Sequence, residues 1–550
     1  MDFNRKIYLF LLPFVLSLAF FLLGLFTISD YGINWDEPTH FVRGQAYLDF
    51  FLSGGRETYG QESGGRKSIY KYSDHQADFY LENDCCHPVI NGIFFSFFNK
   101  IFFEKLGWLQ DIEAYSLAGI FLSSILVFLI TWFVSKEFSL LAGLVSGLSL
   151  FFYPVFFAET HFNVKDPPEA LFYSACLISI YYAVRSVSWK LLLLSGILFG
   201  LAWGTKFNIL FIPFIIAPWT IFYLIKNKSD PRFKIISVKI FLLSIVPVLI
   251  LMGFVVFFAS WPYLWQDPVN NLGNIFLWYK HIGTSTNYTP AFLLYGFNTY
   301  PAVWTFLTTP LITLLLLITG ILWSLGKIIK KDKKTSLLVL ILLWFFVPFI
   351  RVTVPGASLY GGVRQIMEFV PAMAILSGIG LTGIIDFTKP KIVRNFVVFI
   401  LLCLFLFGVW DVMRIHPNET VYFNQIAGGL SGAYQKNIIE AGGDLGNVYR
   451  QGADWLNNNV ERNARLTLIN NGTSAIPSSF LRSDIRFSDE FWSGEEQRGE
   501  YVMNVTHVEW DKVFPDKANY IETLEPVFEI KIDGVPVLKI WKNEEKYLGK

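Results

Sequence analysis

The chain has 550 residues, of which 53% are hydrophobic and only 16% charged, and its mean hydropathy is +0.44. A composition this apolar excludes a soluble globular protein, and repeated apolar runs of about 17 to 25 residues match the thickness of a bilayer. The net charge of +1 gives no reason to expect a nucleic-acid or acidic partner. The sequence therefore predicts a polytopic α-helical membrane protein.

The first apolar run, "IYLFLLPFVLSLAFFLLGLF" (7–26), is long and lacks a small-residue cleavage site, so we expect a signal anchor. Arg5 and Lys6 precede it and predict a cytoplasmic N-terminus. About eleven membrane spans are expected, at 7–28, 113–134, 139–157, 167–185, 190–205, 207–225, 238–259, 303–325, 335–350, 365–386 and 395–412.

A further run, "HPVINGIFFSFFNKIFF" (87–103), is ambiguous in length, and charge decides its interpretation. With eleven spans, the inner loops contain Lys136, Lys226, Lys228, Arg232, Lys234, Lys327, Lys330, Lys331, Lys333, Lys334, Lys389, Lys391 and Arg394. A twelfth span at 88–104 would move nearly all of these cations to the outside, against the positive-inside rule. We therefore expect 88–104 to be a juxtamembrane helix in the outer leaflet, with Asn99 and Lys100 reaching toward the headgroups.

This topology places residues 29–112, 158–166, 260–302 and 351–364 on the outer face, together with everything after about 413. The C-terminal part lacks spans. "ADWLNNNV" (453–460) predicts a short amphipathic helix, "RLTLIN" (465–470) a strand, and 526–542 a hairpin turning at Asp533-Gly534. We expect two parts: a membrane domain (1–412) with a first outer loop at 29–112, and a small extracytoplasmic α/β domain (413–550).

Two adjacent carboxylates, Asp36 and Glu37, lie in "NWDEPTHF" (34–41), where the chain leaves the first span. One interpretation is that they are solvated loop acids. The alternative is a functional acid, because Trp35 and Pro38 flank the pair and a carboxylate near apolar surface has a raised pKa and can accept a proton.

A second acidic segment, "HFNVKDPPEALF" (161–172), precedes the fourth span. Asp166 before two prolines is explained by helix capping and the helix dipole. Capping does not explain why His161, Asn163, Lys165 and Asp166 crowd one short outer loop. Ionisable groups at membrane depth are costly and usually mark a site.

Other candidates each have a structural alternative. His87, in "HPVING", is typical of a helix start at the interface, and Lys206, in "WGTKFN", is either an interfacial anchor or a phosphate partner. Arg364 either extends to solvent or binds a phosphate at headgroup depth. "WPYLWQDP" (261–268) is typical of an aromatic belt at the interface rather than of catalysis.

The sequence contains no Walker motif, GxGxxG loop, zincin helix or GxSxG elbow. The four cysteines show neither a disulfide framework nor the spacing of a thiolate metal site. The absence of a nucleotide-binding motif favours a substrate that is already in the membrane, such as a lipid-linked donor.

Five segments, in this order, resemble the GT-C superfamily of membrane glycosyltransferases, in particular its family 39 group with the protein O-mannosyltransferases and the bacterial aminoarabinose transferases. "WDEPTHF" resembles the first-loop acidic motif and "HPVING" the segment that ends that loop. "HFNVKDPPEALF" resembles the second acidic site, "LYGGVRQIMEFVPAMAILSGIG" the late arginine segment, and "HPNETVYFNQIAGGLSGAY" the start of the outer domain. The chain departs from the pattern at Val89, where many members have a second Pro, and at Gly361-Gly362, where relatives often carry an Asp.

The resemblance implies a GT-C fold and transfer of a hexosyl or pentosyl group, with inversion, from a polyprenyl phosphate to an acceptor outside the cytoplasmic membrane. It implies three catalytic acids: Asp36 is the general base or orients the acceptor hydroxyl, and Glu37 tunes or positions Asp36. Asp166 assists in binding the acceptor or the sugar, or holds Lys165 or His161. Candidates for binding the donor phosphate or substrate are His87, His161, Lys165, Lys206 and Arg364.

No cofactor is required on this hypothesis, although Asp36, His87, His161 and Asp166 leave a divalent metal site open. The acceptor is a protein, lipid or polysaccharide. The alternatives are a lipid-diphosphate-dependent glycan ligase or phosphotransferase and, with less support, a transporter. Transporters tend to show internal repeats and midplane charges, and this chain shows neither.

Overall fold

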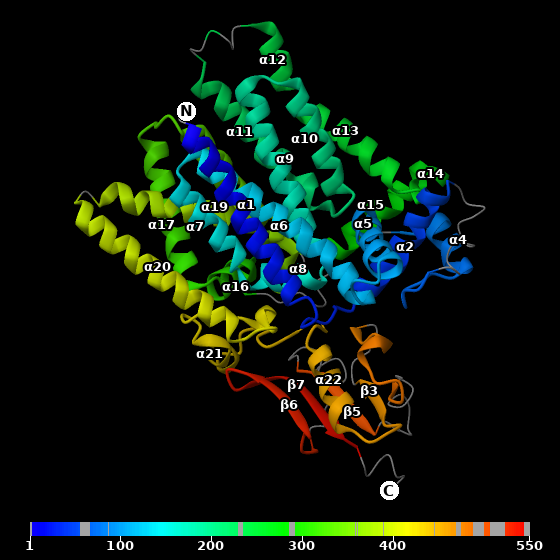
Figure 1. Cartoon of the computed structure of the whole chain (residues 1–550). Helices are drawn as coiled ribbons and strands as arrows, with labels where there is room; N and C mark the ends of the chain where they lie inside the picture. Colours follow the sequence, from blue (N-terminus) through cyan, green and yellow to red (C-terminus); the bar gives the residue numbers. More distant parts are fainter. Residues whose placement is uncertain are drawn as a thin grey trace.

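Long helices form one bundle, and the C-terminal strands lie below it in the computed structural model (Figure 1). The structure describes residues 3–54, 66–85, 87–228, 231, 235–284, 292–357, 359, 361–388, 390–444, 446–468, 475–487, 500–506 and 523–543. Arg232, Lys234 and Lys389 of the predicted basic loops, and residues 469–470 of the predicted strand, lie outside these ranges.

Within the described ranges, seven helical segments are long and apolar enough to cross a membrane. They are α1 (Phe3–Phe26), α6 (Asp111–Glu137), η3 with α11 (Phe207–Phe211 and Pro213–Lys226), α17 (Leu311–Ile329), α18 (Thr335–Thr353), η5 with α19 (Arg364–Phe369 and Val370–Phe387) and α20 (Lys391–Met413). The number rises to nine if two bent pairs each count as one span, namely α7 with α8 (Leu140–Phe151 and Pro154–Phe162, 59°) and α12 with α13 (Ile236–Leu243 and Ile245–Ser260, 46°).

The remaining two predicted spans are α9 (Asp166–Ser186) and α10 (Trp189–Trp203). α9 is buried along most of its length, and α10 has only 15 residues. At 1.5 Å per residue, α10 covers roughly 22 Å, less than the ~30 Å of a bilayer core. The count of eleven spans therefore stays a prediction.

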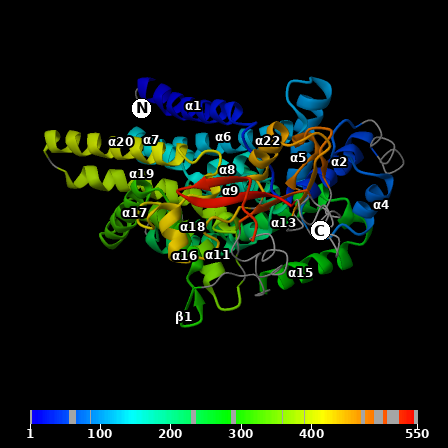
Figure 2. The ribbon, with the colours of Figure 1, turned by 90° about the horizontal axis from the view of Figure 1, so that it is seen from below.

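Apolar side chains cover the outside of the bundle. α1 and α20 lie at its rim (Figure 2). On α20, Phe396, Phe399 and Trp410 are each more than half exposed. An apolar surface this extensive is expected where a protein faces lipid. Inside the bundle, α17 and α19 cross so closely that a Cβ on Gly320 or Gly380 would meet backbone of the facing helix, a packing typical of membrane helices.

Several connections between the long helices meet at one end of the bundle. Lys334 Nζ donates to the Glu137 carbonyl at 2.5 Å, and Arg185 Nη1 lies 3.1 Å from Glu137 Oε2. Lys226 Nζ donates to the Asp332 carbonyl at 2.6 Å. The start of α1 and helix α12 lie opposite the C-terminal sheet (Figure 1). The described ends of these predicted inner loops are therefore grouped together, and which side faces the cytoplasm stays a prediction.

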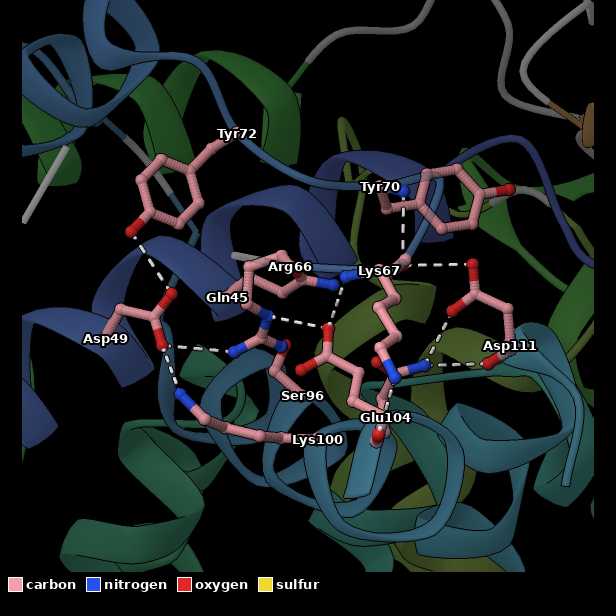
Figure 3. Close-up of polar contacts among 12 residues, drawn as sticks. Gln45, Asp49, Arg66, Lys67, Tyr70, Tyr72, Ser96, Lys100, Glu104 and Asp111 are labelled. Carbon is pink, nitrogen blue, oxygen red and sulfur yellow. Dashed lines mark hydrogen bonds and ion pairs between the residues drawn. The ribbon is translucent and has the colours of Figure 1, made fainter. Parts of the chain in front are cut away.

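The apolar run at 87–103 forms α5 (Ile90–Asn99), followed by a π-helical turn, η2 (Lys100–Lys105). It is too short to span, in keeping with the prediction, but the expected orientation of its polar residues is wrong. Asn99 is fully buried and donates to the Asp111 side chain at 2.7 Å, and Lys100 Nζ lies 2.8 Å from Asp49 Oδ1 (Figure 3). The reason is that the carboxylates of Asp49 and Asp111 are buried, and a buried carboxylate is costly in free energy unless donors such as Asn99 and Lys100 bind it.

The helices and strands that lie outside the predicted spans are shorter. They are α2 (Glu37–Ser53), α4 (Asp74–Glu82), α14 (Tyr263–Gln266), α15 (Pro268–Thr284), the hairpin β1–β2 (Leu293–Leu294 and Phe297–Asn298), α16 (Tyr300–Thr308), η6 (Glu419–Val421) and α21 (Gly429–Gln435).

The C-terminal part contains a five-stranded sheet of order β4-β3-β5-β7-β6. Its elements are α22 (Tyr449–Asn459), β3 (Arg465–Leu468), η8 (Ser478–Phe480), β4 (Arg486–Phe487), β5 (Tyr501–Val505), β6 (Phe528–Ile532) and β7 (Val535–Lys542). The predicted helix, strand and hairpin are confirmed. Asp533 and Gly534 both have positive φ, as a two-residue turn between paired strands requires. The division at 412/413 stays a prediction.

Candidate active site

Asp36 ends the loop after α1 and is the N-cap of α2. Pro38 fits the first turn of α2, where a backbone N–H is not needed. The Asp36 side chain makes no capping hydrogen bond, and it is 42% exposed. The carboxylate is therefore not consumed by the helix that it precedes.

Two cations from separate segments face this carboxylate. Lys165 Nζ lies 3.6 Å and Arg364 Nη2 3.9 Å from Asp36 Oδ2. Both distances exceed the ~2.7–2.9 Å of a charge-assisted hydrogen bond, so the oxygen can still accept a hydrogen bond from a hydroxyl. The late arginine and the two acidic segments thus meet, as the sequence predicted.

The charge state of Asp36 differs from expectation. Burial alone would raise the pKa of Asp36, but the charges of Lys165 and Arg364 outweigh burial and hold the pKa below its ordinary value. The raised pKa predicted from the aromatic neighbours is therefore wrong, because that argument did not include the two cations. Asp36 is ionised at neutral pH.

Asn163 organises the second acidic segment. Its side-chain oxygen accepts from the backbone N–H groups of Lys165 at 2.8 Å and Asp166 at 2.9 Å. Its amide nitrogen donates to Asp166 Oδ2 at 2.8 Å and Glu159 Oε2 at 2.6 Å. The Asn163 side chain thus uses both of its donor hydrogens and both acceptor positions of its oxygen on neighbouring groups, and it fixes the backbone at Lys165 and Asp166.

Lys206 joins this segment to η5. Its Nζ lies 2.6 Å from Asp166 Oδ1 and donates to the Gln365 carbonyl at 2.8 Å. Asp166 is 2% exposed, so Lys206 is the counter-ion that makes its burial tolerable. Lys206 therefore binds Asp166 and the backbone beside Arg364, and it does not act as an interfacial anchor.

A second buried ion pair, between Arg351 and Glu368, fixes η5 against α18. Arg351 Nη2 lies 3.0 Å from Glu368 Oε1, and Asn208 donates to the Gln365 carbonyl at 2.7 Å. The Trp344 indole donates to the Glu368 carbonyl at 2.8 Å. These contacts fix the short helix that begins at Arg364.

Glu37 and Glu159 are buried carboxyls in the two acidic segments that carry Asp36 and Asp166. Glu37 is fully buried, and its two carboxyl oxygens have no hydrogen-bond partner in the described part of the chain. Burial, and then the charge of Asp36, raise the pKa of Glu37 well above its ordinary value and favour its neutral form. Glu159 was not predicted as a site residue; the signal was its position one helical turn before Asn163.

His87 lies at the edge of the site as a neutral imidazole. Its ring contacts the rings of His40 (centroids 5.3 Å apart) and Trp278 (4.7 Å). Burial, and then the charges of Lys165 and Arg43, lower the pKa of His87 well below its ordinary value. A neutral imidazole can donate one hydrogen bond to a substrate, but it does not add a positive charge.

His161 is the one predicted site residue that the structure does not bring to this group. It is fully buried, lies 3.0 Å from Thr27 Oγ1 and stacks on Tyr31 with ring centroids 4.0 Å apart. His161 lies on the face of α8 that packs against the loop after α1, and it therefore points away from Asp166. Among the described residues, no three His, Cys, Asp or Glu side chains are grouped to hold a metal ion, so the four residues considered for a metal do not meet.

The first outer loop anchors the far end of α2 through buried charges (Figure 3). Arg66 Nη1 lies 3.0 Å from Asp49 Oδ1, and Arg66 Nε lies 3.0 Å from Glu104 Oε1. Tyr72 also donates to Asp49, at 3.1 Å. The helix whose N-terminus carries Asp36 is therefore anchored at its far end.

Known structures share this architecture. ArnT from Cupriavidus metallidurans in the apo state superposes with a TM-score of 0.50 at 14% identity, covering 96% of this chain and 97% of that one; the form bound to undecaprenyl phosphate gives 0.50 at 13% with the same coverage. The apo oligosaccharyltransferase of Archaeoglobus fulgidus gives 0.51 at 10% identity, covering 92% of this chain and 70% of that one. No curated protein sequence matches the chain.

The chain is therefore a multi-pass membrane protein with the GT-C fold, and the predicted resemblance is confirmed. Residues 57–264 match the model of the dolichyl-phosphate-mannose-protein mannosyltransferase family, which identifies the protein as a glycosyltransferase. That range includes His87, Lys165, Asp166 and Lys206, whereas Asp36 and Arg364 lie outside it.

Proposed function

We propose that the protein transfers a sugar from a polyprenyl-phosphate donor to an acceptor on the outer face of the cytoplasmic membrane. The observation that carries the proposal is the convergence of an accessible carboxylate, Asp36, with two cations, Lys165 and Arg364. The family match and the fold shared with a protein that binds undecaprenyl phosphate support a lipid-linked donor.

In this mechanism the acceptor hydroxyl donates a hydrogen bond to Asp36, and its oxygen attacks the anomeric carbon of the donor sugar. The bond between that carbon and the phosphate oxygen breaks, and polyprenyl phosphate leaves with the bonding electron pair. The attacking oxygen gains positive charge as the new bond forms, so its proton becomes acidic enough for a carboxylate of low pKa. A single displacement inverts the anomeric configuration.

Lys165 and Arg364 have two roles in this scheme. Before the reaction they hold Asp36 ionised, and during it they stabilise the charge that grows on the departing phosphate. Preorganised cations in a site of low dielectric are a large source of rate acceleration. Neutral His87 donates a hydrogen bond to the donor, and Asp166, paired with Lys206, maintains the geometry of Lys165.

The test is the purified protein with a panel of polyprenyl-phosphate sugars and a membrane extract as acceptor, scored by release of polyprenyl phosphate. We expect release from at least one lipid monophosphate donor, dependent on the acceptor and absent in Asp36→Asn. Release only from diphosphate-linked glycans would replace the proposal with the ligase or phosphotransferase alternative.

The orientation belongs to the proposal and has its own test. A cysteine introduced at Ser478, on the C-terminal side, should react in intact cells with a membrane-impermeant maleimide, whereas one at Lys330 should not. The opposite pattern would place the site on the cytoplasmic side.

A further inference from the structure

A turn two residues before Arg364 is built around a carboxylate from the C-terminal part of the chain. Gly361 and Gly362 both have positive φ, a backbone conformation that glycine adopts without steric cost. Gly361 N–H donates to both carboxylate oxygens of Glu440 at 3.1 Å, and Gly362 N–H donates to Oε2 at 3.2 Å. The Tyr300 hydroxyl donates to the same Glu440 oxygen and accepts from Gly362 N–H at 3.0 Å.

This turn packs directly on the Arg364 side chain. A Cβ at Gly361 would lie only 2.9 Å from Arg364 Nε. A displacement of the turn would therefore move the guanidinium that faces Asp36. Glu440 is 9% exposed, so its carboxylate is committed to this contact rather than to solvent.

The same C-terminal segment also holds the loop that carries Asp36. Asn447 Oδ1 accepts from the Gly32 N–H at 2.8 Å, four residues before Asp36, and the Asn447 amide donates to the Pro417 carbonyl at 3.0 Å. Asn447 is 1% exposed. The backbones approach so closely that a Cβ at Gly32 would clash with the Asn447 carbonyl oxygen.

Between these two contacts the segment is stiffened by Asp444. Its carboxylate accepts from the N–H groups of Gly446 at 2.9 Å and Val448 at 3.1 Å, and from the Thr420 hydroxyl at 2.8 Å. One short, internally bonded segment thus touches both turns that present the opposed charges of the site.

We propose that Glu440 and Asn447 are positioning residues that fix the separation of Arg364 and Asp36, so that the C-terminal part takes part in the reaction without touching substrate. This inference rests on the proposed function for its kinetic readout.

The test compares Glu440→Gln and Asn447→Ala with a matched control, Asp411→Asn. Asp411 is also a buried carboxylate, and it accepts from Arg414 at 2.9 Å, Tyr422 at 2.9 Å and Gln425 at 2.7 Å, none of which belongs to either turn. We expect Glu440→Gln to lower kcat about 10- to 100-fold, with the KM for the donor within about threefold, because small misplacements of catalytic groups have effects of this size. Asp411→Asn should change kcat by less than about twofold at a comparable loss of melting temperature.

A double-mutant cycle separates positioning from simple stability. If Glu440 acts through Arg364, then adding Glu440→Gln to Arg364→Ala brings little further loss of kcat. Independent, multiplicative losses would overturn the inference, as would a Glu440→Gln protein whose kcat falls no further than that of the Asp411→Asn control.

A second readout does not depend on the donor. Spin labels at Thr39 and Val354, exposed positions beside the two turns, report their separation once the exposed Cys403 is replaced by Ser. We expect the distance distribution to broaden in Glu440→Gln and to remain narrow in Asp411→Asn. Broadening in a protein that releases no polyprenyl phosphate would reject the proposed function and keep the positioning role, whereas unchanged distances would reject the positioning role alone.

Discussion

Lys165 Nζ lies 3.6 Å from Asp36 Oδ2, although the two residues belong to loops separated by three of the long or paired helices of the bundle, α6, α7 and α8. The distance leaves the carboxylate ionised and still open to a hydroxyl. Asp36 is thus close enough to Lys165 for its charge to be compensated and far enough to accept a hydrogen bond from substrate, and the predictions on the site start from this geometry.

Asp36→Asn should lower kcat by roughly 10²–10⁴-fold, the usual contribution of general base catalysis. The substitution keeps the shape of the side chain, so the melting temperature in detergent should stay within a few degrees of the wild type. Polyprenyl phosphate release measures the rate. A folded Asp36→Asn protein with undiminished transfer would remove Asp36 from its assigned role.

Arg364→Ala should lower kcat by about 10²–10³-fold, because it removes a preorganised cation from the departing phosphate. Arg364→Lys restores the charge but not the planar group, so its kcat should lie between those of Arg364→Ala and the wild type. Equal rates for the Lys and Ala variants would show that charge at this position does not matter.

Asp166 and Lys206 form a buried pair, so removing either partner leaves an uncompensated charge. Asp166→Asn and Lys206→Met should each destabilise the protein by about 3–5 kcal/mol, and the double variant should be more stable than either single one. Thermal unfolding in detergent measures all four proteins. Additive losses in the double variant would contradict a mutual counter-ion role.

Glu37→Gln should retain kcat within about threefold at pH 7. Burial and the neighbouring Asp36 charge raise the pKa of Glu37 well above its ordinary value, so Gln mimics the neutral form that this environment favours. Glu37→Ala is the contrasting variant, since it opens a cavity beneath Asp36 and should lower both stability and rate. A loss above tenfold in Glu37→Gln would mean that the ionised form is used.

His416 should stabilise the protein mainly at acidic pH. Its Nε2 lies 3.0 Å from Asp30 Oδ2, its Nδ1 lies 2.8 Å from Glu419 Oε1, and the Tyr31 hydroxyl lies 3.2 Å from Nδ1. Burial alone would lower the pKa of His416, but the hydrogen bonds and charges of Glu419 and Asp30 outweigh it and raise the pKa above its ordinary value.

Because the folded-state pKa is raised, this stabilisation is complete below the unfolded pKa of about 6.5 and is lost as pH rises through the folded-state value. His416→Gln should therefore reduce the free energy of unfolding by roughly 1–2 kcal/mol at pH 5.5 and by clearly less at pH 9. A loss that is equal at both pH values would show that only packing matters.

Much of the fold follows from local signals. Apolar runs of bilayer length predicted α1, α6, α17, α18 and α20 because lipid imposes a length on any helix that crosses it. The hairpin at Asp533-Gly534 followed from turn chemistry. The short α10 and the bent α7–α8 pair illustrate the limit, since hydropathy records that a segment is apolar but not whether it is straight or long enough.

The sequence predicted most of the residues that form the site, but it did not predict their charge states. The sequence indicated Asp36, Lys165, Asp166 and Arg364 because their residue types are unusual where a chain leaves the membrane. It missed the lowered pKa of Asp36 and the direction in which His161 points, because both depend on which helix faces which. Glu440 was beyond local reasoning, since its partners at 361 and 362 are distant in the chain.

The contacts that Glu440 and Asn447 make with the two turns also determine when the site can form during synthesis. Both residues follow α20 in the chain, so the ribosome delivers them only after α1 to α20 have been made. A nascent chain that has inserted through α20 holds the Asp36 and Arg364 turns without the segment that braces them. The protein therefore acquires a competent site only after the segment that carries Glu440 and Asn447 has been made, and a chain truncated after α20 should reside in the membrane without turning over donor.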